Sequence, residues 1–558
     1  MKQVGLSHQA KVAHYLFNCP EYLETTFGSF LGGYVPVNTN YRYGPEEILY
    51  LFDNSDAEAV VFHAVFADLC SQVRERLPKV KRWYMVPDES GAALPEWALN
   101  YNDVVSKEVA DIVPGKPLSE DDMLFLYTGG TTGMPKGVMW RQEDLLAVLG
   151  RGGNAISGVA PAESVEEIIA RIQPGWISNR ALVACPLMHG TGQFSAFITL
   201  ALGGCIITMP NRNFDPAKLW DTVERDQVNS IVIVGQAFAG PMLESLDENV
   251  GRWNLSSVVQ MGSSGVMWSQ ENKNALLEHI PQMFITDSFG SSEAVGMGMS
   301  VAAKGAAPKT AQFALGPNCV VFTEEGERVQ PGSGERGLVA VGGAIPVGYY
   351  KDEVKTAQTF RQFEGRRWTV PGDWAEVNED GTLKQFPVKQ MLEWATNGIG
   401  PRIYGTKMRS IVHGTGMVHP VLKQQFTLAR TIWEHGLVPI IEPEVPIDNP
   451  IKAKVESALM FHLQEFLDEF PGKCILKLTP PEVPNLYHNL TVFHNVERVV
   501  FLSGGYSTAE ACNRLGLNDN ITASFSRALS EGLRYDLTDT EFDATISNNI
   551  KMITEASE

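Results

Sequence analysis

Cysteine is scarce in this sequence, and the cysteines present follow no pattern typical of a disulfide framework or a metal site. Seven occur among 558 residues, widely separated and without a Cys-x-x-Cys pair. The odd number and the scatter favour reduced thiols and a cytoplasmic protein. We expect no zinc site.

Long apolar runs are also missing. The opening residues, MKQVGLSHQAKVAHYLF, lack the uninterrupted apolar segment that a signal peptide requires. The longest apolar stretch, residues 194–209, is too short to cross a membrane and contains a glycine pair. It predicts a buried helix that leads into a buried strand. We expect neither a secretion signal nor a membrane span.

Positive charge is in deficit, because 45 lysines and arginines face 65 aspartates and glutamates, for a net charge of −20. This balance argues against nucleic acids and anionic membranes as main partners and favours small molecules. The hydrophobic content of 44% is typical of a globular chain with large cores. The length corresponds to roughly three or four domains of ordinary size.

A glycine-rich segment at residues 127–137, YTGGTTGMPKG, follows a short apolar run that predicts a buried strand. Glycines allow turns with positive φ, successive N–H groups in such turns can bind an anion, and the threonines and the lysine add donors. The order of residues excludes a Walker A loop. We therefore predict a phosphate site formed by Thr128, Gly129, Gly130, Thr131, Thr132, Gly133 and Lys136.

The pattern of helices and strands changes near residue 385. Before this point, helical segments such as 45–54 alternate with short β-rich runs, which predicts an α/β layered architecture. The runs are 57–63, 82–87, 181–186, 230–235 and 257–262. Residues 315–385 contain more glycine and turn signals, and predict a β-rich subdomain. The expected regions are therefore 1–314, 315–385 and 386–558.

After residue 385, strands and long helices alternate. Apolar residues at helical spacing predict helices over 422–433 and 451–470, and Thr538 with Glu541 forms a capping box before a last helix. In that last helix we expect four side chains to point inward: Phe542, Ile546, Ile550 and Ile553. About five strands, starting at 403–412, indicate part of an eight-stranded (β/α)8 TIM barrel.

Five segments before residue 385 resemble, in the same order, the motifs of adenylate-forming enzymes of the acyl-CoA synthetase family. They are residues 127–137, PLMHGTG at 186–192, MGSSG at 261–265, SFGSSE at 288–293 and PGDWAEVNEDG at 371–381. The resemblance implies ATP, Mg²⁺ and CoA as cofactors. It also implies a role in fatty acid metabolism, in which a carboxylic acid and ATP give an acyl-adenylate and then a CoA thioester.

The resemblance also implies roles for single residues. His189 would lie near the acyl group, Phe289 would stack on adenine, Glu293 would hold Mg²⁺, and Asp373 would bind both ribose hydroxyls. The remaining nucleotide-binding residues that it implies are Gly262, Ser263, Ser264, Gly290 and Ser292. Joining a carboxylate to a phosphate brings two anions together, so backbone amides, Lys136 and Mg²⁺ would lower the barrier by spreading the charge.

Members of this family carry a small C-terminal domain after the ribose-binding segment, with a lysine that reaches the α-phosphate. The sequence after residue 381 does not match that domain, and the matching region begins late relative to the family. We therefore expect a truncated form in which nucleotide binding is retained more readily than turnover with CoA.

Residues from about 400 to the end resemble class I fructose-bisphosphate aldolase of the bacterial kind. The segments GTKMRS, GLVPIIEPEV, ILKLT, FLSGGYS and ASFSRAL occur in the family's order. The resemblance implies reversible cleavage of fructose 1,6-bisphosphate, a reaction of glycolysis, with no cofactor beyond a Schiff-base lysine. That lysine would be Lys477; Lys407 and Arg409 would face the active site, and Glu442 and Glu444 would transfer protons. The implied phosphate ligands are Ser503, Gly504, Gly505 and Arg527.

The residue types fit this chemistry. Lys477 lies in an apolar strand, where loss of hydration favours the neutral amine that attacks a carbonyl. Glu442 and Glu444 share one face of a strand, because side chains alternate with period two. A lysine in a strand can instead point outward between helices, and either glutamate could cap a helix.

Two hypotheses remain open at this stage. The chain is a fusion of a ligase-like and a lyase-like enzyme, or it is a non-catalytic chimera of two truncated domains that at most binds a nucleotide or a sugar phosphate. Five strands leave a barrel open, and unpaired strand edges favour pairing with another chain. A homo-oligomer that completes the barrel is therefore a further prediction.

Overall fold

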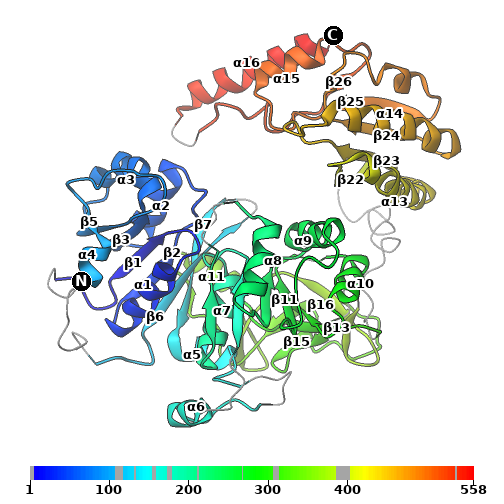
Figure 1. The fold of residues 1–558 in the computed structure, drawn as a ribbon. Helices are drawn as coiled ribbons and strands as arrows, with labels where there is room; N and C mark the ends of the chain where they lie inside the picture. The colour runs from blue at the N-terminus through cyan, green and yellow to red at the C-terminus, as the bar shows by residue number, and fades with distance from the viewer. Residues whose placement is uncertain are drawn as a thin grey trace. The chain divides into compact units, whose positions relative to one another are not determined.

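The computed structural model describes ten stretches of the chain: residues 5–106, 117–130, 133–153, 159–172, 179–209, 213–266, 268–305, 313–384, 403–534 and 537–557. The chain divides into two compact units, residues 1–385 and 386–558. The first is coloured blue through green in Figure 1, and the second yellow through red. Thr131 and Thr132 of the predicted phosphate segment lie outside the described residues.

One sheet of the first unit has eight strands in the order β17-β7-β6-β2-β1-β3-β4-β5. These strands are β1 (Lys11–Tyr15), β2 (Val35–Asn38), β3 (Ala57–His63), β4 (Arg82–Val86), β5 (Leu99–Asn100), β6 (Met123–Gly130), β7 (Gly133–Arg141) and β17 (Gly348–Tyr349). Strands β1 to β6 pair in parallel. Strands β6 and β7 form an antiparallel hairpin, and β17 pairs with β7. The glycine-rich segment therefore lies within a hairpin, with β17 beside it.

Helices in this part of the unit pack apolar faces against the sheet. They are α1 (Pro20–Leu31), α2 (Pro45–Asn54), α3 (Ala67–Val73) and α4 (Tyr101–Val105). Both α1 and α2 begin with proline, whose fixed φ suits the first helical turn. Leu51 and Phe52 of α2 are buried in one cluster with Val60 and Phe62 of β3.

A second sheet of the first unit has 13 strands. The order is β18-β19-β16-β20-β21-β14-β13-β12-β11-β10-β8-β9, with β15 paired to β16. Its strands are β8 (Arg180–Val183), β9 (Cys205–Ile207), β10 (Ser230–Ile233), β11 (Gln260–Ser264), β12 (Phe284–Phe289), β13 (Gly298–Ala303), β14 (Phe313–Leu315), β15 (Cys319–Phe322), β16 (Gly337–Val341), β18 (Phe360–Phe363), β19 (Arg366–Thr369), β20 (Trp374–Val377) and β21 (Thr382–Lys384). The helices beside them are α5 (Gln142–Val148), α6 (Val165–Arg171), α7 (Gly190–Ala201), α8 (Pro216–Arg225), α9 (Gln236–Glu248), α10 (Gln270–His279) and α11 (Glu353–Thr359). The mixed α/β fold expected from the sequence is confirmed.

Two predicted segments differ in detail from the structure. The strand expected at 257–262 begins only at Gln260, because the backbone first turns: the N–H of Val258 donates to Leu255 O, and the hydroxyl of Ser257 donates to Val228 O. The strand that follows α7 is β9, which lies at the edge of its sheet and is only partly buried.

The second unit is built on a five-stranded, all-parallel sheet in sequence order. Its strands are β22 (Gly405–Ile411), β23 (Val438–Glu444), β24 (Cys474–Leu478), β25 (Val496–Phe501) and β26 (Thr522–Ala523). Its helices are α13 (Thr415–Glu434), α14 (Lys452–Glu469), the 3-10 helix η4 (His488–Val492), α15 (Thr508–Leu515) and α16 (Asp539–Ser557). The five strands and the long helices predicted from periodicity are confirmed. The partial TIM barrel is not confirmed; the described strands form one open sheet in which the outer edges of β22 and β26 pair with no other described strand. The oligomer that would complete a barrel stays a prediction.

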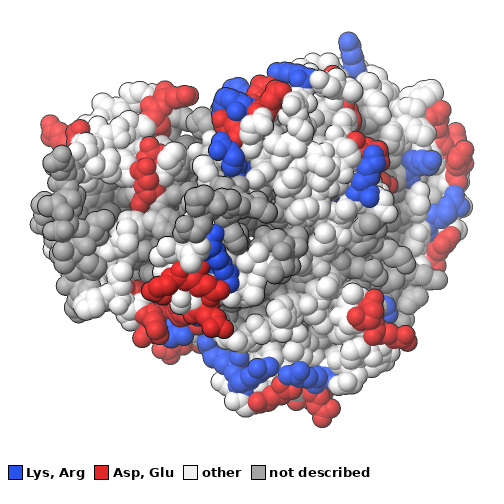
Figure 2. All heavy atoms as spheres, turned by 60° about the horizontal axis from the view of Figure 1, so that its bottom comes forward, with Lys and Arg blue, Asp and Glu red and all other residues white. Residues whose placement is uncertain are grey.

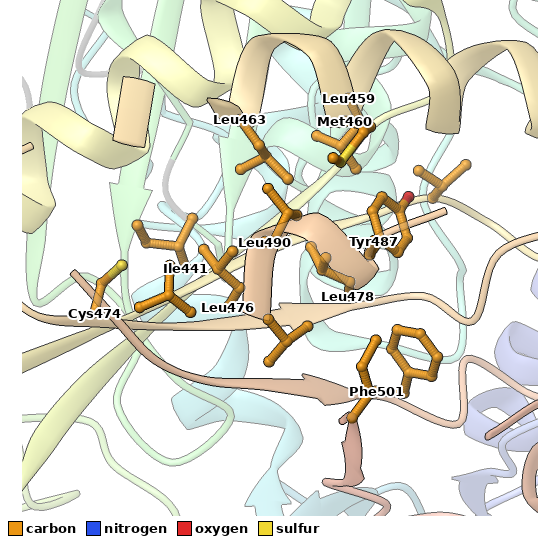
Figure 3. Packing of buried hydrophobic residues seen from close by; sticks show 14 of the residues in the cluster. Ile441, Leu459, Met460, Leu463, Cys474, Leu476, Leu478, Tyr487, Leu490 and Phe501 are labelled. Atoms are coloured by element: carbon orange, nitrogen blue, oxygen red, sulfur yellow. The ribbon is translucent and has the colours of Figure 1, made fainter. Parts of the chain in front are cut away.

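The core of the second unit lies on one face of this sheet. Figure 3 shows Ile441 of β23 and Leu476 of β24 packed beneath Leu459 and Leu463 of α14. Side chains alternate along a strand, so the neighbouring Lys477 must point to the opposite face. The helices therefore cover the apolar face and leave the other face to polar residues.

The last helix, α16, uses only part of the face that the apolar pattern predicts: Ile553 packs against the core and Ile546 is half-buried, but the other two side chains are exposed. Phe542 is 41% exposed and Ile550 is 49% exposed. Asn549 is buried instead, and its side-chain amide donates to the carbonyl groups of Leu529 and Glu531. A buried amide requires acceptors, so these two hydrogen bonds help to fix the rotation of the helix. The capping box of Thr538 and Glu541 is confirmed, since each side chain accepts from the other residue's N–H.

A buried ion pair joins α14 to the segment that follows β24. Lys452 Nζ contacts the carboxylate of Glu456, and it lies 2.7 Å from Pro480 O and 3.2 Å from Glu482 Oε1. The side chains of Lys452 and Glu456 are 4% and 0% exposed. Loss of hydration raises the pKa of Glu456.

We expect the substitution Lys452→Met to destabilise the second unit by about 3–5 kcal/mol, because it leaves a buried carboxylate without its partner. The pKa of Glu456 is already raised, so its carboxyl should take up a proton as the pH falls. The difference in unfolding free energy between Lys452→Met and wild type should then become smaller. The measurement is the free energy of unfolding from hydrogen exchange of second-unit peptides, between pH 8 and pH 5. The exposed Lys454 of the same helix provides the control Lys454→Met, which should change little.

No helix among the described residues is long and apolar enough to cross a membrane. On the face shown in Figure 2, lysines and arginines form separate groups, many of them beside acidic residues, and they do not gather into a broad basic patch. This distribution agrees with the acidic overall balance of the sequence.

Candidate functional site

The polar face of the second unit's sheet carries a pocket of about 360 Å³. Its lining residues are Lys407, Arg409, Glu442, Glu444, Lys477, Leu502, Ser503, Gly504, Ser524, Ser526 and Arg527. The structure thus brings together nearly all the residues that the sequence singled out in this half of the chain. They come from β22, from the C-terminal halves of β23 and β24, and from the segments after β25 and β26.

Glu442 lies between two amines. Lys477 Nζ is 3.5 Å from Glu442 Oε1, and Lys407 Nζ is 2.6 Å from Glu442 Oε2. The side chain of Lys477 is 11% exposed and that of Glu442 is 4% exposed, whereas Lys407 is 44% exposed. A nearly buried lysine with a carboxylate at this distance can exchange protons with it while the amine reacts with a carbonyl.

Arg409 and Glu444 form a second ion pair in the same pocket. Arg409 Nε donates to Glu444 Oε2 at 2.7 Å. This hydrogen bond raises the pKa of Arg409. Glu444 is therefore held by an arginine, and Glu442, beside the Lys477 amine, is the better placed carboxylate for proton transfer.

The backbone ladder between β23 and β24 is short, since it pairs only Ile440 with Ile475 and Ile441 with Leu476. Beyond it, the buried hydroxyl of Thr479 donates to Val445 O at 2.9 Å and accepts from Val445 N at 3.0 Å. One side chain therefore replaces ladder hydrogen bonds just past Lys477. The sequence analysis did not identify this residue.

The far end of the pocket holds the residues expected to bind phosphate. Gly504 and Gly505 have φ of 60° and 108°, a region that favours glycine. A Cβ at Gly505 would lie 3.9 Å from Arg527 Nη1, so the guanidinium is beside this turn. Ser503 is buried and Arg527 is exposed. Ser524 and Ser526 also line the pocket; they flank the buried Phe525, and this alternation is the sequence signal that could have revealed them.

In the first unit, Lys136 lies on β7 and faces residues of the segment that begins with β17. Its Nζ is 2.7 Å from Asp352 Oδ2 and 5.8 Å from the centroid of the Tyr349 ring. Thr128, opposite Lys136 in the hairpin, is partly buried, and Gly129 is exposed. The predicted phosphate segment therefore presents a lysine next to an aromatic ring and a carboxylate.

Tyr349 also contacts the predicted metal ligand. Its hydroxyl donates to Glu293 Oε1 at 2.8 Å. Loss of hydration and the charge of Glu293 raise the pKa of Asp373. Tyr349 thus contacts both Lys136 and Glu293, and Asp373 is close enough to Glu293 for the charge of one carboxylate to act on the other. Two neighbouring carboxylates suit a divalent cation that carries phosphates. No group of three or more metal-binding side chains occurs among the described residues. A cation here would therefore complete its coordination with water or with phosphate oxygens.

The predicted adenine-facing residues lie on adjoining strands. Gly262, Ser263 and Ser264 belong to β11, and Phe289 ends the neighbouring β12. The hydroxyl of Ser263 is buried and accepts from Gly235 N, so this side chain supports the loop. Gly290 and Ser292 follow β12, and Ser292 O accepts from Trp140 Nε1 on β7. The ring of Phe289 lies 5.6 Å from that of Phe313.

His189 immediately precedes α7 and is exposed. The adjoining Met188 is tied to the phosphate hairpin by Asn38, whose side-chain amide donates to Tyr127 O at 2.8 Å and to Met188 O at 2.6 Å. Asn38 also accepts from Tyr127 N. This buried residue links two of the predicted motifs, and no periodic pattern in the sequence marks it.

The aldolase-like resemblance of the second unit is supported in part by comparison with known proteins. The chain is 44% identical over 183 residues to class 1 fructose-bisphosphate aldolase of Clostridium acetobutylicum. The match covers 32% of this chain and 62% of that protein.

The similarity of the first unit to known proteins covers a larger part of the chain. A long-chain-fatty-acid–CoA ligase from Archaeoglobus fulgidus shares its fold with a TM-score of 0.56, at 18% identity over 74% of this chain and 80% of that chain. The chain is 35% identical over 418 residues to a medium/long-chain-fatty-acid–CoA/3-oxocholest-4-en-26-oate–CoA ligase of Mycolicibacterium smegmatis, covering 74% of each protein. Residues 1–350 match the family of AMP-binding enzymes. The chain therefore belongs to the AMP-binding acyl-CoA ligase family.

Proposed function

We propose that the first unit binds MgATP and an apolar carboxylic acid and joins them as an acyl-adenylate, with CoA as the acceptor of the acyl group. The observation that carries this proposal is that Lys136 and Glu293 both contact Tyr349, while Asp373 lies close enough to Glu293 for their charges to interact. Lys136 would bind phosphate, Glu293 would hold Mg²⁺, and Asp373 would accept from the ribose hydroxyls. The acids named for the similar ligase are fatty acids and a sterol carboxylate, and they support a large apolar substrate.

We propose that the second unit is a Schiff-base lyase site for a phosphorylated ketose, with fructose 1,6-bisphosphate as the expected substrate. The Lys477 amine attacks the ketone carbon, and Glu442, 3.5 Å away, returns a proton to the hydroxyl that leaves as water. Arg527 and the glycine turn after Ser503 would bind a phosphate group. The partial match to an aldolase supports this assignment.

Activity of the first unit is tested with wild-type protein, ATP, Mg²⁺, dodecanoic acid and hydroxylamine, which traps an acyl-adenylate as the hydroxamate. We expect hydroxamate that depends on ATP. If no hydroxamate forms while MgATP still raises the melting temperature, the first unit binds nucleotide without turnover. That outcome would favour the alternative hypothesis, in which this part of the chain binds a nucleotide but does not catalyse a reaction.

The hydroxyl of Tyr349 should affect the requirement for Mg²⁺. The substitution Tyr349→Phe removes a hydrogen bond to the Glu293 carboxylate, and such bonds contribute on the order of 1.5–3 kcal/mol. We expect the Mg²⁺ concentration for half-maximal hydroxamate formation to rise about tenfold. The matched control is Tyr350→Phe, because the hydroxyl of Tyr350 bonds to Asp56 instead. An equal effect of both substitutions would show that Tyr349 does not act through Glu293.

A further inference from the structure

Asp352 occupies the junction between β17 and α11 and uses its two carboxylate oxygens for different purposes. Oδ1 accepts from Lys355 N at 2.9 Å and caps the first turn of α11. Oδ2 lies 2.7 Å from Lys136 Nζ. One residue thus follows closely on a strand that pairs with the phosphate hairpin, begins a helix, and neutralises the lysine of the hairpin.

This ion pair is open to exchange with a ligand. The side chains of Lys136 and Asp352 are 40% and 32% exposed. Exposed pairs of this kind are weak, because water and salt screen them. Hydrogen bonding from Lys136 lowers the pKa of Asp352, so the aspartate is charged at neutral pH. A polyphosphate carries more negative charge than one carboxylate and presents several acceptor oxygens to the same amine.

We propose that Asp352 is the resting counterion of Lys136 and that the phosphates of a nucleoside triphosphate must displace it. This inference rests on the proposed function of the first unit, in which Lys136 binds phosphate. Asp352 then lowers the apparent nucleotide affinity and keeps Lys136 in one place while the site has no ligand. After displacement Oδ1 can still cap α11, so the helix is not disturbed.

The substitution Asp352→Asn separates the two tasks of the residue, because asparagine caps helices as well as aspartate does but carries no charge. We expect the Kd for MgATP, measured by isothermal titration calorimetry of the full chain, to fall by roughly three- to tenfold at low salt. The gain in MgATP affinity should diminish at high salt, since screening weakens the ion pair that the substitution removes. The control Glu353→Gln removes an exposed charge from the next residue and should leave the Kd nearly unchanged.

A double substitution tests whether the effect acts through Lys136. Lys136→Ala and Lys136→Ala/Asp352→Asn should bind MgATP equally, because the competing contact no longer exists in either variant. An unchanged or raised Kd in Asp352→Asn, or the same gain in the Lys136→Ala background, would overturn the proposal.

The counterion contact can also be tested without nucleotide. Acetylation of Lys136 by a dilute acetylating reagent, followed by peptide mass spectrometry, should proceed several-fold faster in Asp352→Asn than in wild type. Faster acetylation without MgATP binding by either protein would refute the proposed function of Lys136 but retain the ion pair. Equal acetylation rates would refute the resting counterion itself.

Discussion

Borohydride added together with dihydroxyacetone phosphate should attach the triose irreversibly to the wild-type chain and should fail to do so in Lys477→Met. The ketone of this probe can form a Schiff base only with a neutral, accessible amine, and reduction makes that bond permanent. Lys477 is the nearly buried amine beside Glu442 in a pocket that also holds Arg527. The measurement is the mass of the intact protein, followed by identification of the modified peptide.

Methionine is a suitable replacement because it keeps the length and the apolar stem of the side chain, and Glu442 retains its contact with Lys407. The control Lys473→Met removes an exposed lysine just before the same strand, one that donates to His494 O. It should leave the adduct unchanged. An adduct that persists in Lys477→Met, or one located on Lys407, would contradict the assignment of the Schiff-base lysine.

The second large effect concerns the phosphate hairpin. We expect Lys136→Ala to lower the rate of ATP-dependent hydroxamate formation by about a hundred- to thousandfold, which is typical for the loss of one group that stabilises charge in a transition state. The reason is that the carboxylate and the α-phosphate are both anions, and in the proposed function Lys136 would supply positive charge where they meet.

A surface lysine provides the comparison. Lys218, in the first turn of α8, is 62% exposed and lies 3.9 Å from Asp215. Lys218→Ala should retain the wild-type rate and the wild-type melting temperature. Equal rates for Lys136→Ala and wild type would exclude Lys136 from the chemistry, even if the nucleotide still binds.

The residues of the second unit's pocket could be named in advance because the sequence resembles the aldolase family. A local rule adds that Lys407 with Arg409, and Glu442 with Glu444, share a face, since each pair is spaced two apart on a strand. Apolar runs identify these strands and most strands of the first unit. The glycine-rich segment was predicted as a strand and a loop, and its pairing with β7 as a hairpin was not predicted.

The contacts that organise the first site were not predictable in this way. Asn38 bonds to Tyr127 and Met188, and Asp352 to Lys136, across 89, 150 and 216 positions of sequence. A periodic pattern of apolar residues cannot reveal such pairs, because they depend on how elements far apart in the sequence pack together. The exposure of Phe542 and Ile550 on α16 was not predicted for a related reason: the buried amide of Asn549 finds its two acceptors in the carbonyl groups of a preceding segment.

The hydroxyl of Thr479 has a consequence for where the amine and the carboxylate of the second site lie. Below Lys477 and Glu442, the backbone ladder joins the two strands directly; above them, the Thr479 hydroxyl takes over the polar groups of Val445. Each strand end also stays paired with its other neighbour, β22 or β25. The amine and the carboxylate therefore lie where direct pairing between their two strands has stopped but the sheet on either side continues.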